Sequence, residues 1–186
     1  MNQQTLSTKT LVTTAMFTAI IAVLSILEIP SPTGVPFTLQ TFAIALCGFV
    51  LGQKQGTFCV FLYVLLGAVG VPIYAGMTSG LGKLLGVTGG FLFGFIPMAA
   101  LCGLKKSNKI LNISFALLGL IICHLLGTLQ FALLMTAKNH AEFSFLHASL
   151  AVSIPYLPKD ILSVIGAYFV SLALKHQLRQ ANLSIN

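Results

Sequence analysis

Charged residues are scarce in this sequence of 186 residues, and acids are the scarcest of all. Asp and Glu together number three, against ten Lys and Arg, and Trp is missing altogether. An average soluble domain has about 25% charged residues, whereas this chain has 7%. Such a composition excludes an ordinary soluble globule, whose surface it could not cover. The net charge of +7 reflects missing acids rather than a dense basic patch, which argues against nucleic acid as a partner.

The sequence also lacks the motifs of common enzymes and cofactor sites. It contains no GxSxG, HExxH or GxxxxGK[ST] motif, and its four cysteines form no CxxC pair. All four cysteines lie in apolar segments, where we expect them to fill the core. We therefore expect no catalytic residue, no metal and no other cofactor. Any energy from ATP has to come from another protein.

Apolar residues are correspondingly abundant. They make up 56% of the sequence, and the mean hydropathy is +0.97. A helix needs about 20 mostly apolar residues to cross a bilayer, and fewer when its ends pack against protein. Six segments qualify, so we predict an all-α integral membrane protein with six transmembrane helices in a single domain over residues 1–186. The segments are Leu11 to Leu27, Phe37 to Leu51, Gly56 to Gly70, Gly89 to Gly103, Ile110 to Thr136 and Asp160 to Leu174.

The loops between these segments differ in charge from one side to the other. One side receives seven bases and no acid, namely Lys9, Lys54, Lys105, Lys106, Lys109, Lys175 and Arg179. The other side receives three bases and all three acids, namely Lys83, Lys138, Lys159, Glu28, Glu142 and Asp160. Because positive residues in short loops favour the cytoplasm, both termini are predicted to be cytoplasmic.

The outer side combines glycine-rich backbone with polar and aromatic side chains. Residues 71–90 are dense in glycine, and such irregular backbone must be buried in protein or line a cavity. Glycine also lets the backbone come close to a ligand. The alternatives are that the polar residues cap helices, that the aromatic ones belong to the membrane interface and that the lysines reach the surface. The candidate ligand-binding residues are Gln40, Tyr74, Lys83, Phe91, Lys159 and Asp160.

The first segment carries a stripe of small residues at helical spacing, formed by Ala15, Thr18, Ala19 and Ala22. Small residues let membrane helices approach closely. The stripe is therefore either an internal helix contact or a docking face for a partner membrane subunit.

Two polar residues, His124 and Gln130, lie inside the fifth segment. Polar side chains in a membrane helix commonly hydrogen-bond a neighbouring helix, and this is the interpretation that we prefer. The alternative is that they mark a path through the protein.

Five motifs in fixed order resemble those of the BioY family, the biotin-binding S components of energy-coupling factor (ECF) vitamin transporters. The resemblance runs from about Thr10 to Leu174. The motifs are GVPFTLQTF at 34–42, GQKQG as a turn after the second segment, LYVLLGAVGVPIYAG at 62–76, GLGKLLGVTGGFLFGF at 80–95 and LPKD at 157–160.

The resemblance implies a six-helix S-component fold in a prokaryotic cell membrane, with biotin captured at the outer side. It implies that Ala15 and Ala19 dock on a transmembrane coupling subunit, which is joined to two ATPase subunits. Asp160 would accept the two N–H groups of the ureido ring, and Gln40 or loop amides would bind its carbonyl. Tyr74 and Phe91 would contact the apolar remainder of biotin.

The sequence departs from the usual family pattern at three positions. The family has proline and tyrosine where this chain has Val87 and Phe91, and a lysine where it has Ser163. That lysine would meet the biotin carboxylate, so Lys83 or Lys159 is expected to take its place. Three alternatives remain open: a close biotin analogue or precursor as ligand, a stand-alone facilitator, and a small integral-membrane enzyme.

Overall fold

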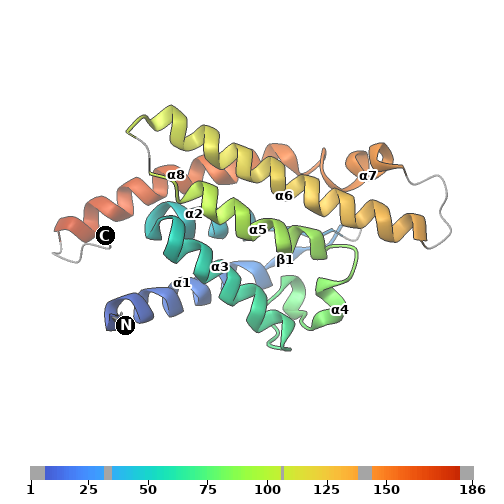
Figure 1. Ribbon diagram of the computed structural model, residues 1–186, viewed down its shortest axis with the longest axis horizontal. Helices are drawn as coiled ribbons and strands as arrows, with labels where there is room; N and C mark the ends of the chain where they lie inside the picture. Colours follow the sequence, from blue (N-terminus) through green and yellow to red (C-terminus); the bar gives the residue numbers. More distant parts are fainter. Residues whose placement is uncertain (1–6, 32–34, 106, 138–143, 181–186) are drawn as a thin grey trace, which may run out of the picture.

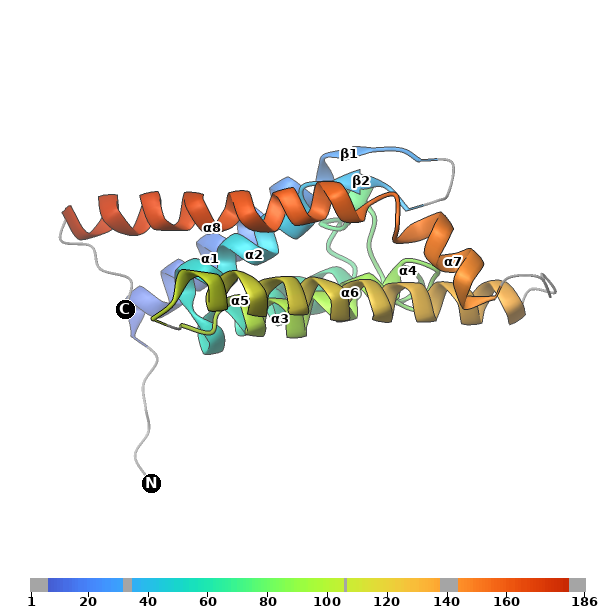
Figure 2. The same ribbon diagram turned by 90° about the horizontal axis from the view of Figure 1, so that it is seen from above.

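Three long helices run roughly along the longest axis of the computed structural model, which describes residues 7–31, 35–105, 107–137 and 144–180 (Figures 1 and 2). They are α1 (Thr8–Ile26), α6 (Lys109–Ala137) and α8 (Leu157–Gln180). Each contains a stretch that is long and apolar enough to cross a membrane. Helix α8 begins three residues earlier than predicted, so Asp160 lies in its first turn rather than at its first position.

Three shorter helices occupy the remaining predicted segments. They are α2 (Gln40–Leu51), α3 (Gln53–Ala68) and α5 (Gly89–Cys102). The predicted GQKQG turn is wrong, because only Gly52 breaks the helix, with a φ of 81°, and α3 begins at the next residue. The chain thus reverses direction between α2 and α3 at a single glycine, whose missing Cβ permits this conformation.

Helices α5 and α6 pack closely along their length, and glycine makes this contact possible. A Cβ added at Gly94 would lie 2.6 Å from the Cα of Cys123, and one added at Gly119 would lie 3.0 Å from the Cα of Met98. Close backbone approach through small residues is how membrane helices gain contact without a hydrophobic driving force between them. All four cysteines are buried and free, which confirms the expectation that they fill the core.

Short elements gather at the end of the molecule opposite the start of α1 (Figure 2). Strand β1 (Glu28–Ile29) pairs antiparallel with β2 (Phe37–Thr38), with Glu28 opposite Thr38. The second predicted segment was therefore wrong at its start, because Phe37 belongs to a strand. The glycine-rich segment holds the 3₁₀ turn η1 (Ala75–Met77) and helix α4 (Leu81–Leu84), and α7 (Phe145–Val152) precedes α8. The sequence patterns predicted none of these elements.

The described charges separate between the two ends of the bundle. Lys9, Lys54, Lys105, Lys109 and Lys175 belong to the end where α1, α3 and α6 begin and α8 finishes, and Glu28, Lys83, Lys159 and Asp160 to the other (Figure 1). Gly34, Lys106, Lys138 and Glu142 lie outside the described residues, and of Arg179 only the backbone is described. The charge separation agrees with the predicted loop assignment. Which end faces the cytoplasm stays a prediction.

Candidate ligand-binding site

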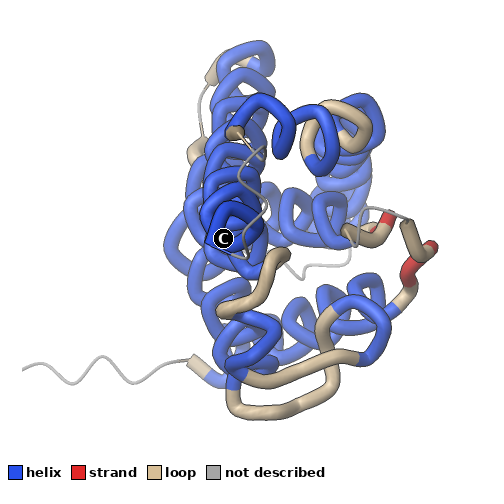
Figure 3. Tube along the Cα trace, turned by 90° about the vertical axis from the view of Figure 1, so that its right-hand side faces the viewer, coloured by secondary structure: helices blue, strands red, loops and turns tan. Residues whose placement is uncertain are grey.

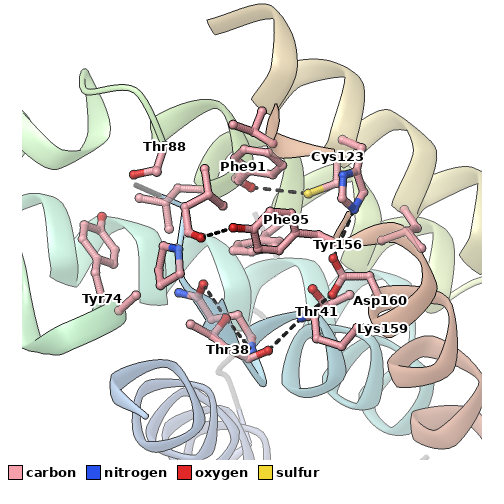
Figure 4. A pocket seen from close by; sticks show the side chains of 18 of the residues that line it. Thr38, Thr41, Tyr74, Thr88, Phe91, Phe95, Cys123, Tyr156, Lys159 and Asp160 are labelled. Carbon is pink, nitrogen blue, oxygen red and sulfur yellow. Dashed lines mark hydrogen bonds and ion pairs between the residues drawn. The ribbon is translucent and has the colours of Figure 1, made fainter. Parts of the chain in front are cut away.

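A pocket opens among the β1–β2 hairpin, the glycine-rich segment and helices α5, α6 and α8. Figure 3 shows the short elements around this end of the bundle, and Figure 4 shows the pocket from close by. Side chains that are far apart in the sequence meet here. The pocket is lined by all six predicted ligand residues, Gln40, Tyr74, Lys83, Phe91, Lys159 and Asp160.

Asp160 is the one carboxylate in the lining, and it is 5% exposed. Its Oδ1 lies 2.6 Å from Nζ of Lys159, and its Oδ2 lies 3.2 Å from Nε2 of His124. A buried carboxylate is tolerated only when partners of this kind compensate for the lost hydration. The N-terminal turn of α8 adds the favourable end of a helix dipole. Asp160 is thus held ionised and fixed at the pocket wall.

Lys159 and Lys83, the two lysines in the lining, have different surroundings. Besides Asp160, the Lys159 ammonium donates to the carbonyl oxygen of Thr38 at 2.9 Å, which ties α8 to strand β2. Lys83 lies half-buried in α4, and within the described ranges its ammonium makes no hydrogen bond or ion pair. Of the two predicted partners for a ligand carboxylate, Lys83 is therefore the one with its donors still available.

Tyr74 is 1% exposed, so it is no interfacial aromatic of the membrane belt. Its hydroxyl donates to the carbonyl oxygen of Val64 at 2.6 Å, and its ring lies directly on Gly67 of α3. Burial raises the pKa of Tyr74 to about 12, so the hydroxyl stays a donor near neutral pH. The hydroxyl is used inside the protein, which leaves the ring as the surface that a ligand can contact.

Gln40 begins α2, and its side chain is engaged by two neighbours rather than capping the helix. Its Oε1 accepts from the Thr38 hydroxyl at 3.1 Å, and its Nε2 donates to the Tyr63 hydroxyl at 2.9 Å. An amide nitrogen carries two hydrogens, so one donor remains. Gln40 is therefore oriented at the pocket and can donate to a ligand carbonyl.

Aromatic side chains form much of the remaining wall. Phe91 and Phe95 come from α5 and Tyr156 from the turn before α8. Tyr156 stacks on Phe37 at 4.4 Å between ring centroids. Its hydroxyl contacts the hairpin by donating to the carbonyl oxygen of Val35, and it lies 2.8 Å from Ser31 Oγ. Such walls suit the apolar body of an organic ligand.

His124 is an ionisable pocket residue that was not among the predicted ligand residues. Its predicted role as a polar contact is confirmed, because Nδ1 lies 3.1 Å from Ser153 Oγ while Nε2 faces Asp160. The ring also lines the pocket and meets Phe91 edge to face at 5.7 Å. An ionisable residue inside a membrane segment was the available signal for a functional role.

Gln130, the second polar residue of the fifth predicted segment, binds the last residue of α4 and the turn that follows it, so its predicted role as a polar contact between helices is confirmed. Its Nε2 donates to the carbonyl oxygens of Leu84 at 3.1 Å and Gly86 at 2.7 Å. It thereby fastens to α6 the glycine-rich segment that carries Lys83.

The small-residue stripe of α1 divides into a buried part and an exposed part. Thr18 is buried, and its hydroxyl lies 3.5 Å from the carbonyl oxygen of Cys59 in α3. Ala22 packs partly buried against the core, whereas Ala15 and Ala19 are exposed. The internal contact is thus made by Thr18 and Ala22, and the two exposed alanines leave a surface on which another helix could pack.

Neither Val87 nor Ser163 takes part in the pocket lining described here. Val87 packs against a smaller hydrophobic cluster that includes Tyr156 and Val152. Within the described residues, no group of three or more His, Cys, Asp or Glu side chains is arranged to hold a metal ion. The site consists of one carboxylate, two lysines, a histidine, an amide and aromatic rings.

Comparison with known proteins finds the same family over nearly the whole chain. The BioY family model matches residues 1–180. A Thermotoga maritima protein named biotin transporter BioY is 37% identical over 168 residues, covering 89% of this chain and 95% of that protein. A Rhodobacter capsulatus protein of the same name is 36% identical over 160 residues, covering 81% and 84%.

A solved structure has the same fold. The crystal structure of the S-component for biotin from an ECF-type ABC transporter matches with a TM-score of 0.78 and 25% sequence identity, covering 90% of this chain and 91% of that one. Family model, relatives and fold agree, and this chain belongs to the BioY family.

Proposed function

We propose that this protein is the biotin-binding S component of an ECF vitamin transporter and captures biotin at its outer face. The observation that carries the proposal is a single pocket in which a fixed carboxylate and an unpaired lysine, Asp160 and Lys83, stand on different elements with aromatic walls between them. Biotin matches this arrangement, since it has a ureido ring, an apolar middle and a carboxylate tail. The names of the relatives support transport rather than catalysis.

Each part of biotin has a partner in this arrangement. Asp160 accepts from the two ureido N–H groups, in the charge-assisted geometry that makes strong hydrogen bonds. The remaining N–H of Gln40 donates to the ureido carbonyl. The thiophane ring and alkyl chain lie against Tyr74 and Phe91, and Lys83 binds the carboxylate. A few oriented polar groups within apolar walls give such a pocket its specificity.

Calorimetric titration of biotin into the purified, detergent-solubilised protein tests the proposal. Asp160→Asn should weaken binding by at least about 1.5 kcal/mol, because it removes a charged acceptor. Lys54→Gln is the control, since Lys54 is exposed at the opposite end of the bundle and its change should leave affinity unaltered. Failure of the wild-type protein to bind biotin would refute the function, and equal binding by Asp160→Asn would remove Asp160 from the site.

The same proposal includes the arrangement in the membrane. As one domain, α1, α2, α3, α5, α6 and α8 form six spans in a prokaryotic cell membrane, with both termini cytoplasmic. The short length of α2 and α5 is compatible with spans that pack against protein rather than lipid.

Labelling of single cysteines by an impermeant thiol reagent in intact cells tests the orientation. A cysteine at Lys83 should react from outside, and a cysteine at Lys54 should react only after the cells are opened.

We further propose that Ala15 and Ala19 dock on the transmembrane coupling subunit, which carries two ATPase subunits. Their exposure on α1 supports this role. Changing both to leucine should abolish ATP-driven biotin uptake while biotin binding stays normal. Met16→Leu, at an exposed neighbouring position, is the control. Full uptake by the double variant, or by cells without the coupling subunits, would contradict the docking role.

A further inference from the structure

We infer that His124 is a positioning residue of the ligand site, which fixes the Asp160 carboxylate through a hydrogen-bond chain from α6. The inference rests on the proposed function and adds a residue that determines how tightly, and how selectively, the ureido end is bound. His124 is buried at 7% exposure, and both of its ring nitrogens have partners.

The chain links three parts of the fold. Thr128 and His124 lie one helical turn apart on α6, and Ser153 lies in the connection between α7 and α8. The Thr128 and Ser153 hydroxyl oxygens are 2.5 Å apart, Ser153 Oγ is 3.1 Å from Nδ1 of His124, and Nε2 is 3.2 Å from Asp160. An unbroken path of buried polar contacts therefore leads from α6 to the carboxylate.

The chemistry of the groups sets the direction of this path. An ionised carboxylate only accepts, so the Nε2 atom of His124 must donate to Asp160. In the neutral ring Nδ1 then accepts from the Ser153 hydroxyl, which in turn accepts from Thr128. In this order every donor in the chain has an acceptor, whereas Asp160 Oδ1 faces the Lys159 ammonium at 2.6 Å and accepts no hydrogen bond within the described residues. A buried network of this kind holds its members in one arrangement.

The His124 ring is in contact with two pockets. It lines the ligand pocket, where it meets Phe91 edge to face. It also lines a second, mostly apolar groove between α6 and α7, together with Thr128 and Ser153. Hydrogen bonds at both ring nitrogens therefore supplement packing in setting the orientation of the ring.

Asp160 is consequently held at both oxygens by different elements, with Lys159 of α8 on Oδ1 and His124 of α6 on Oδ2. The acceptor positions that remain are fixed before a ligand arrives. Fixing a binding group in advance raises affinity, because the ligand does not have to pay for ordering it. Without His124 the carboxylate would keep its charge but lose its orientation.

Biotin titration of three variants tests the inference. His124→Leu fills a similar volume without a donor and should weaken biotin binding at least tenfold. His124→Gln keeps an N–H that can reach Asp160 and should bind within threefold of the wild-type protein. His176→Leu, at an exposed position near the end of α8, is the control and should leave binding unchanged. If biotin affinity is kept by His124→Gln and lost in His124→Leu, the N–H donor is what matters, because both side chains fill the space.

Two further measurements separate the inference from the function on which it rests. Combined with Asp160→Asn, His124→Leu should cost little more than Asp160→Asn does alone, because both act on the same contact. Its effect should also be the same for biotin methyl ester, which retains the ureido ring. Unchanged binding by His124→Leu, no rescue by His124→Gln or fully additive losses would overturn the positioning role. No binding of biotin by the wild-type protein would overturn the proposed function, and this inference with it.

Discussion

The ligand end of the bundle and its middle are held together in different ways. In the middle, α5 and α6 meet closely at Gly94, against the backbone and thiol of Cys123, and at Gly119, against the backbone of Met98. At the ligand end, side chains of Asp160, His124 and Gln40 are oriented by hydrogen bonds and ion pairs.

The difference follows from what each region has to do. A helix contact made by glycine requires close steric fit, so an added side-chain atom forces the helices apart. A polar network requires hydrogen-bond partners, so replacing one partner leaves the helices in place but reorients a binding group. We therefore expect substitutions in the middle to affect folding, and those at the ligand end to affect binding.

The largest effect is expected from Gly94→Ala, which places a methyl group 2.6 Å from the Cα of Cys123. Overpacking usually costs about 1–3 kcal/mol, and roughly 3 kcal/mol or more is expected here because the added methyl group meets backbone atoms, which cannot rotate away. The variant should unfold at a clearly lower temperature in detergent, as measured by thermal unfolding. Gly82→Ala is the matched control, because nothing lies within 4 Å of a Cβ there. Equal melting temperatures for the two variants would mean that α5 and α6 can separate freely.

Lys83→Ala should act on binding alone and only toward a charged tail. Loss of a hydrogen bond to a charged group costs about 1.5–3 kcal/mol, so biotin should bind at least tenfold more weakly. Biotin methyl ester, which has no carboxylate, should bind the variant and the wild-type protein equally. Both affinities are measured by titration calorimetry. If the variant lost affinity for the ester as well, Lys83 would not be the partner of the tail.

Tyr156→Phe should have a smaller effect, because it keeps the stacked ring and removes only the hydroxyl that reaches the hairpin. That hydroxyl donates to the carbonyl oxygen of Val35 and lies 2.8 Å from Ser31 Oγ, and its loss costs about 1 kcal/mol. Biotin should dissociate several times faster, since the hairpin is held less firmly over the pocket. Stopped-flow displacement measures this rate, with Tyr168→Phe, a buried tyrosine outside the pocket lining, as control. An unchanged rate would show that the hydroxyl does not restrain the ligand.

Sequence patterns predicted the helical segments well and the short elements poorly. Long apolar runs such as Lys109–Ala137 impose a helix because their backbone groups must be satisfied internally. The β1–β2 hairpin and α7 are too short for any periodicity to appear, and they form because of contacts such as Lys159 to Thr38. Their existence depends on tertiary structure, which a pattern along the chain does not contain.

The site residues also fall into two groups, those that the sequence made recognisable and those that only the tertiary structure reveals. Gln40 and Asp160 were recognisable because polar residues at the start of apolar segments are unusual, and Tyr74 because it lies in the glycine-rich stretch 71–90. The residues that hold the site in place were not, because Tyr63 beside Gln40, Ser153 beside His124 and Thr38 beside Lys159 are ordinary residues that become important only through their positions. His124 had a visible signal, but its link to Asp160 spans 36 residues of sequence.

Helix α6 has one further consequence, because it carries the anchors of both ends of the pocket. His124 contacts Asp160, the carboxylate that we propose as the partner of the ureido ring, and Gln130 holds the segment that carries Lys83. The two anchors are six residues apart, which is about 9 Å of rise along a helix. Since a helix cannot stretch, this spacing fixes the distance between the two polar ends of the pocket and thereby the length of ligand that fits. Analogues whose chain is shorter or longer than that of biotin would have one polar end out of register.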